Sequence, residues 1–326
     1  MKDLDIRRQS EQAYGQWAPQ WRKHAKYHSK MAMHSMEQLR NTGIGRAVLC
    51  IANGFSFEEN IDTIKKYQDN VDIVACDKTL VHCLDNGIIP KYVVLCDANV
   101  SSEKYLEKHR DKLKDIILIA NVCGNITWTD PKIWKKIYFF VNKDIIKSEL
   151  EFSQLSGCPN IIVAGTNVSN AMVIALTQCD EKGSSNFFGY DRILLIGYDY
   201  SWNESYYAFD KEGGGKTNYM RTVTAIDANQ ELCYTSSNLY FSSQWFEKYV
   251  GVYKIPVSQC TKKSITLPGA YSDLEKSMQY SYKKEDGAKV FSLLDKRAKI
   301  IKELNQIDGN LKTINHDHHL SYLVSR

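Results

Sequence analysis

The sequence lacks the features that mark secreted, zinc-ribbon and membrane-spanning proteins. Its nine cysteines include no CxxC pair, so neither a structural zinc site nor a disulfide framework is indicated. No run approaches the roughly 18 apolar residues that a membrane-spanning helix needs. The stretch 1–17 also has no apolar core of the kind found in signal peptides. We therefore expect a cytoplasmic protein that makes no contact with a membrane.

A strong excess of charge is absent as well. Lys and Arg number 42 against 38 Asp and Glu, which gives a formal net charge of +4. This balance is compatible with a phosphate-bearing ligand but does not by itself indicate nucleic acid. With 326 residues, 43% of them hydrophobic, the chain can bury one large domain or a domain with an appendage.

The stretch around which the chain is organised runs from Ala47 to Asn99. Its first part, Ala47–Ala52, is an apolar run typical of a strand buried on both faces of a parallel sheet. The run ends in a turn at Asn53 and Gly54, and Ser56 is the predicted cap of the helix that follows. A turn of this kind points backbone N–H groups at an anion.

Two more strands of this stretch end in polar residues. Val71–Ala75 leads to Asp77, and Tyr92–Cys96 leads to Asp97 and Asn99. Open α/β sheets bind their ligands at the carboxyl ends of the strands. These residues are therefore predicted to lie together at one ligand-binding edge.

The remaining chain continues the alternation of strands and helices. Strands are predicted at 116–120, 134–141, 161–164 and 193–196, helices at 101–114 and 170–179, a polar connection at 148–156, and a short strand and helix within 234–250. The fold class is α/β, a Rossmann-like, mostly parallel sheet with helices on both faces and helical extensions at both ends. We expect a helical lead at 1–46, a nucleotide-binding catalytic domain at 47–272, and a C-terminal helix and tail at 273–326.

The helical lead mixes aromatic and basic side chains, among them Tyr14, Trp21 and Arg22. Such a mixture can stack on nucleic acid, or it can belong to an amphipathic helix that packs its aromatic face on the domain. We favour packing. His24 and His28 are spaced at i and i+4 but have no carboxylate at ligand spacing, so a metal site is not indicated.

These segments resemble the family named after 6-hydroxymethylpterin diphosphokinase, which includes the Maf proteins of flagellar glycosylation and is related in fold to bacterial sialyltransferases. The resemblance is carried by the following stretches: 47–57, Gly87–Asp97, Gly165–Val168, Ile193–Asp199, Trp245–Glu247, and Thr261 leading to Pro268–Ala270. The chain departs from the family pattern at Ala52, at Tyr198, and at Lys263 and Ser264, where two glycines are usual.

The resemblance implies a nucleotide that carries a diphosphate. Backbone at Asn53 and Gly54, with Ser56 as cap, would hold phosphate. Asp77 and Asn99 would contact the nucleoside.

On the same grounds, Asp97 would bind a divalent ion or orient the sugar, and Asp199 would face the reacting centre. Gly165, Thr166 and Asn167 would form a second turn over the donor. The glycine-rich segment 203–221 is expected to act as a lid or to contact the acceptor through Tyr206, Tyr207 and Arg221, although the tyrosines could equally serve only to pack the segment down.

Three functions fit these features. We favour a glycosyltransferase that moves a sugar from a nucleotide-sugar donor to a hydroxyl acceptor, which could be a glycan, a protein or a hydroxymethylated base in DNA. The alternatives are a diphosphokinase that transfers pyrophosphate from a nucleoside triphosphate to a small alcohol with Mg²⁺, and a non-catalytic nucleotide- or nucleic-acid-binding module. A metal, if one is used, would be bound by Asp97. The donor, the acceptor and the oligomeric state are left open by the sequence.

Overall fold

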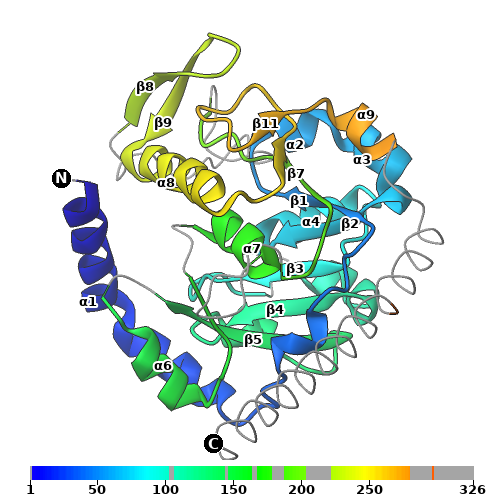
Figure 1. Cartoon of the computed structure of the whole chain (residues 1–326). Helices are drawn as coiled ribbons and strands as arrows, with labels where there is room; N and C mark the ends of the chain where they lie inside the picture. Colours follow the sequence, from blue (N-terminus) through cyan, green and yellow to red (C-terminus); the bar gives the residue numbers. More distant parts are fainter. Residues whose placement is uncertain are drawn as a thin grey trace, which may run out of the picture.

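The computed structural model describes residues 2–102, 106–143, 146–163, 167–177, 187–202 and 222–279, together with residue 296. Its centre is a nine-stranded sheet in which every pair of neighbouring strands is parallel (Figure 1). The strands are β1 (Ala47–Ile51), β2 (Asp72–Cys76), β3 (Tyr92–Leu95), β4 (Ile117–Asn121), β5 (Lys136–Lys143), β6 (Ile161–Val163), β7 (Arg192–Ile196), β10 (Val257–Gln259) and β11 (Ala270–Tyr271). This confirms the predicted fold class.

The order of strands across the sheet is β11-β10-β7-β1-β2-β3-β4-β5-β6. From β1 the chain adds strands in one direction as far as β6, and β7 then returns to the other side of β1. Ile51 of β1 is level with Ala75 of β2 on one side and with Ile196 of β7 on the other. The direction of winding therefore reverses between β1 and β7, and this switch point is where open α/β sheets place ligands.

Alternate residues of the strands form two separate cores because successive side chains point to opposite faces. Cys50, Val74 and Val94 belong to the core on one face, which is completed by α7 (Val168–Thr177) and α8 (Ser237–Tyr253). Leu49 and Val93 face the other way. The helices of that face are α1 (Lys2–His28), α3 (Ile61–Tyr67), α4 (Asp77–Asp85), α6 (Glu149–Ser156) and α9 (Leu274–Gln279).

Shorter elements complete the described part. These are α2 (Phe55–Glu59), five 3₁₀ helices at Met36–Leu39, Gln68–Asn70, Glu107–His109, Lys112–Asp115 and Ile126–Trp128, and an antiparallel hairpin of β8 (Thr222–Ile226) and β9 (Leu232–Ser236). The hairpin stands apart from the main sheet, beside α8 (Figure 1).

Three local predictions were wrong. The polar connection expected at 148–156 is helix α6, whose Phe152 is buried against the sheet. The described part of 101–114 contains two 3₁₀ helices, so the segment is not one continuous helix. Ser56 does not cap α2, because the capping position is Gly54 and Ser56 lies inside the first turn.

Within the N-terminal lead, Lys2–His28 form helix α1, and the aromatic side chains of this helix pack as favoured. Tyr14 and Trp21 of α1 contact the ring of Phe152 on α6, and Figure 1 shows the two helices side by side. Gln20, His24 and His28, which share one face of α1, reach backbone carbonyls of the loops after β3 and β4. No helix among the described residues is long and apolar enough to cross a membrane.

Candidate active site

A cleft of about 450 Å³ opens at the carboxyl ends of the strands, over the switch point. It is lined by the turns that follow strands β1, β3 and β7, by the carboxyl ends of β2 and β5, and by residues at the starts of helices α4, α7 and α8. The lining residues are Asn53, Gly54, Cys76, Asp77, Lys78, Thr79, Cys96, Asp97, Asn142, Asn167, Val168, Ser169, Ala171, Gly197, Tyr198, Tyr200, Ser201, Asn238 and Leu239. Its size falls within the range of small-molecule sites.

The turn after β1 is joined to the turn after β7. The N–H of Gly54 donates to the carbonyl of Gly197 at 3.0 Å. A Cβ at Gly54 would lie 2.5 Å from Oδ2 of Asp199 and 2.6 Å from that carbonyl, so only glycine fits here without a shift. Gly197 has φ +74°, and a Cβ at this position would lie 2.1 Å from the carbonyl oxygen of Ala52. The two glycines thus allow the close approach that closes the cleft floor.

Asp199 lies behind this turn and is not part of the cleft lining. Its buried carboxylate accepts the N–H of Ser56 at 2.8 Å and the Ser56 hydroxyl at 2.5 Å. Ser56 Oγ in turn accepts the N–H of Gly197 at 2.8 Å. Burial raises the pKa of Asp199 to about 6, although the hydrogen bonds from Ser56 work against this rise. The geometry gives Asp199 and Ser56 the task of holding the turn, whereas the sequence had placed both at the ligand.

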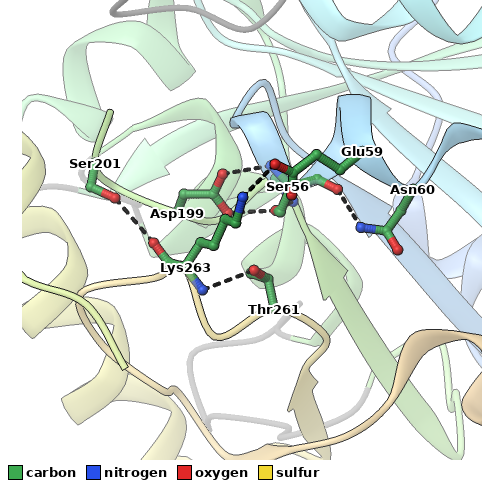
Figure 2. Close-up of polar contacts among 8 residues, drawn as sticks. Ser56, Glu59, Asn60, Asp199, Ser201, Thr261 and Lys263 are labelled. Carbon is green, nitrogen blue, oxygen red and sulfur yellow. Dashed lines mark hydrogen bonds and ion pairs between the residues drawn. The ribbon is translucent and has the colours of Figure 1, made fainter. Parts of the chain in front are cut away.

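Lys263 covers this arrangement from the loop after β10. Its ammonium group pairs with Glu59 of α2, and its backbone carbonyl accepts the hydroxyl of Ser201 at 3.1 Å (Figure 2). The neighbouring Ser264 is buried and donates its hydroxyl to the carbonyl of Tyr198 at 2.9 Å. Lys263 and Ser264, which stand where glycines are usual in the family, therefore connect the loop after β10 to α2 and to the loop after β7.

Two carboxyl groups line the middle of the cleft. Asp77 and Asp97 follow the neighbouring strands β2 and β3. Asp77 is 2% exposed, and its pKa is raised to about 6, first by burial and then by the negative charge of Asp97. Oδ1 of Asp97 accepts the N–H of Asn99 at 2.7 Å.

Several oxygen atoms of the lining are buried and have no hydrogen-bond partner within the part of the chain that is described. They are Asn53 Oδ1, Asp77 Oδ2, Thr79 Oγ1 and Asn142 Oδ1. A buried polar atom without a partner costs about 1–3 kcal/mol. The oxygens of Asn53, Asp77 and Asn142 are therefore suited to a ligand that donates N–H or O–H groups, whereas the Thr79 hydroxyl can also donate to a ligand.

The helix start at α7 is fixed by tyrosines from the β7 turn. The hydroxyl of Tyr198 donates to the carbonyl of Ser169 at 2.7 Å, and the hydroxyl of Tyr200 donates to the side-chain oxygen of Asn170. The amide nitrogen of Asn170 continues to the carbonyl of Ser242 on α8 at 3.2 Å. This buried network holds the starts of α7 and α8 against the cleft.

The structure brings most of the described site predictions together. Asn53, Gly54, Asp77, Asp97 and Asn167 line the cleft, whereas the exposed Asn99 does not. Gly165, Thr166, Tyr206, Tyr207 and Arg221 lie outside the described residues.

The sequence analysis missed Lys78, Thr79 and Asn142 as site residues. A signal for them existed, because each lies at or just after the end of a predicted strand. Asn238, by contrast, comes from the start of α8 and had no such signal.

Comparison with known proteins agrees with the architecture. Residues 22–205 match the sequence model of the family described as 6-hydroxymethylpterin diphosphokinase MptE-like, and the chain belongs to this family, as the resemblance predicted. No curated protein matches the sequence.

Among solved structures, the Maf glycosyltransferase from Magnetospirillum magneticum AMB-1 has a similar fold, with a TM-score of 0.60 at 15% sequence identity. The similarity covers 84% of this chain and 42% of that protein, so this chain spans less than half its length.

Proposed function

We propose that the protein is a glycosyltransferase that binds a nucleotide-sugar donor in the cleft and transfers the sugar to a hydroxyl acceptor. In this reaction the bond between the anomeric carbon and the phosphate oxygen of the nucleotide breaks, the nucleotide leaves, a bond to the acceptor oxygen forms, and the acceptor proton is released. The fold shared with the Maf glycosyltransferase and the membership of the family support the assignment.

The composition of the cleft carries the proposal. Nine of its 19 described lining residues carry neutral amide or hydroxyl groups, and Lys78 is the one basic residue among the 19. Transfer of pyrophosphate from a triphosphate calls for a cluster of cations around the phosphates. Amide and hydroxyl side chains are instead suited to the many hydroxyl groups of a sugar and a ribose.

Asp97 is the best candidate for the general base. It is partly exposed within the cleft, whereas Asp77 beside it is buried. A carboxylate that reaches the acceptor hydroxyl can accept its proton as the new bond forms.

Both carboxylates are also of the ligand type that Mg²⁺ prefers. The described residues contain no group of three or more His, Cys, Asp or Glu that could hold a metal. A metal here would therefore need phosphate oxygens of the donor as further ligands.

A binding and turnover screen tests the proposal. UDP-glucose, GDP-mannose and CMP-N-acetylneuraminate are compared with ATP and GTP by thermal shift, and release of the free nucleotide is followed by mass spectrometry with and without EDTA. We expect stabilisation by one nucleotide sugar and slow release of its nucleotide to water. Stabilisation by triphosphates alone would favour the diphosphokinase instead.

A further inference from the structure

The turn after β1, which the sequence predicted to hold phosphate, already has an anion of its own. The N–H of Ser56 and its hydroxyl both donate to the carboxylate of Asp199. The N–H of Gly54 is bonded to Gly197, and the N–H of Phe57 to the carbonyl of Gly54. A buried side-chain carboxylate thus occupies the start of α2, where a phosphate was expected.

Two other helix starts at the cleft are capped by side chains. On α7, Oδ1 of Asn167 accepts the N–H of Asn170 at 2.9 Å. On α8, Oγ of Ser236 accepts the N–H of Leu239 at 3.2 Å. These caps engage N–H groups that would otherwise be directed at an anion.

The start of α4 differs from these. Its capping position is Cys76, which makes no side-chain capping bond. The first three residues, Asp77, Lys78 and Thr79, all line the cleft. Asp77 Oδ1 accepts the N–H of Lys78 at 2.7 Å, while Asp77 Oδ2 has no partner within the described part of the chain. Thr79 is completely buried, and its hydroxyl oxygen is likewise without a described partner.

From this geometry we infer that the first turn of α4 is the phosphate-binding element of the cleft, with the Lys78 ammonium and the Thr79 hydroxyl as its side-chain ligands. Asp77 Oδ2 then accepts a hydrogen bond from a hydroxyl group next to the phosphate. The inference rests on the proposed function for the identity of the ligand, a sugar or ribose phosphate. The start of a helix favours negative charge, and a lysine adjacent to it strengthens the attraction.

The charges around the turn restrict the class of ligand further. Asp77 and Asp97 place negative charge beside Lys78, the one lysine among the described residues that line the cleft. A nucleoside triphosphate brings more negative charge than one cation can balance, whereas a nucleotide sugar brings less and also supplies hydroxyl donors. The first turn of α4 should therefore favour a phosphate ester with about two negative charges over a nucleoside triphosphate.

Four proteins test the inference: wild type, Lys78→Gln, Thr79→Val, and Lys65→Gln as a charge-matched control on an exposed part of α3. Each is titrated by calorimetry with ribose 5-phosphate and with the nucleotide sugar that stabilises the wild type most. We expect each of the first two substitutions to weaken both probes about tenfold, the effect of one lost charge-assisted hydrogen bond, and the control to leave them unchanged.

Thr79→Val supplies a second readout that a merely structural role would not give. The hydroxyl is buried without a described partner, so valine should raise the melting temperature of the free protein while it weakens the probes. A variant that is destabilised and also binds weakly would indicate damage to the fold and count against the inference.

The failure of this inference and that of the proposed function are distinguishable. Unchanged affinity for both probes in folded Lys78→Gln and Thr79→Val, or no binding of either probe to wild type, would overturn the phosphate site. If sugar transfer is nevertheless observed, the proposed function survives without it. The opposite outcome is that ribose 5-phosphate binds in a manner that depends on Lys78 and Thr79, while the protein neither binds nor turns over nucleotide sugars. This outcome would support the phosphate site and contradict the proposed glycosyltransferase function.

Discussion

The carboxylate of Asp199 accepts two hydrogen bonds from Ser56, although the two residues lie 143 positions apart in the chain. The pair joins the turns after β1 and β7 at the point where the winding of the sheet reverses. Figure 2 shows residues of α2 meeting residues of the loops after β7 and β10 here. The floor of the cleft therefore depends on the contact between these two turns.

The buried carboxylate of Asp199 should make the free energy of unfolding depend on pH. The pKa of Asp199 is raised from 3.8 to about 6 in the folded state, so the folded protein binds this proton more tightly than the unfolded chain. The resulting stabilisation is fully present below a pH of about 3.8 and is lost as the pH rises through about 6. Because the pKa of Asp77 is raised in the same way, Asp199→Asn should reduce, and not abolish, the slope of that part of the curve in urea unfolding. An unchanged curve in the variant would show that Asp199 does not titrate in this window.

Gly54 should tolerate no side chain, because a Cβ would press on Asp199 and on the carbonyl of Gly197. We expect Gly54→Ala to lower the free energy of unfolding by about 1–3 kcal/mol. Gly251→Ala is the matched control, since nothing lies within 4 Å of its Cβ position in α8 and alanine is the better helix former. The control should be neutral or stabilising. Equal effects of both changes would contradict the close approach.

The buried network between Tyr200 and Asn170 should contribute to stability. Tyr200→Phe removes the buried hydroxyl that donates to the Asn170 side-chain oxygen. The expected loss is about 1–3 kcal/mol in thermal or urea unfolding. Tyr240→Phe removes a hydroxyl from a side chain that is 43% exposed, and it should have little effect.

His28 should give a pH dependence of the opposite sign. Burial lowers its pKa to about 4, and the neutral ring contacts the carbonyl of Val122 at 2.8 Å and Thr129 at 2.9 Å. The folded state disfavours the proton, so this stabilisation is present above a pH of about 6.5 and is lost as the pH falls through about 4. His28→Gln should remove the slope in that range. His34→Gln, outside the contact between α1 and the loops after β3 and β4, should retain it.

Asp97→Asn should separate catalysis from donor binding under the proposed function. The amide keeps the size of the side chain but cannot accept the acceptor proton as a carboxylate does. We expect kcat to fall by about a hundredfold or more while the dissociation constant of the donor changes little. Wild-type kcat in this variant would leave Asp97 with only its hydrogen bond to Asn99.

The sequence alone determined the parallel sheet and most of the ligand-binding edge. Apolar runs such as Ala47–Ala52 and Val71–Ala75 are buried on both faces in a parallel sheet, so their local composition is enough to find them. Asp77 and Asp97 follow directly from where such runs end. The strands β10 and β11 were not predicted, because three and two residues are too few to show a pattern.

Only the tertiary structure decided what each polar residue at that edge does. Ser56 and Gly54 look like parts of a phosphate turn in sequence, but Asp199 takes the place of the phosphate once β7 lies beside β1. We infer an anion site at the start of α4 because its capping residue Cys76 makes no side-chain capping bond, unlike the capping residues of α7 and α8. Hydrogen bonding between residues more than a hundred positions apart leaves no local pattern, whereas burial of a strand does. For this reason the edge of the sheet could be located from the sequence, and the roles along it could not.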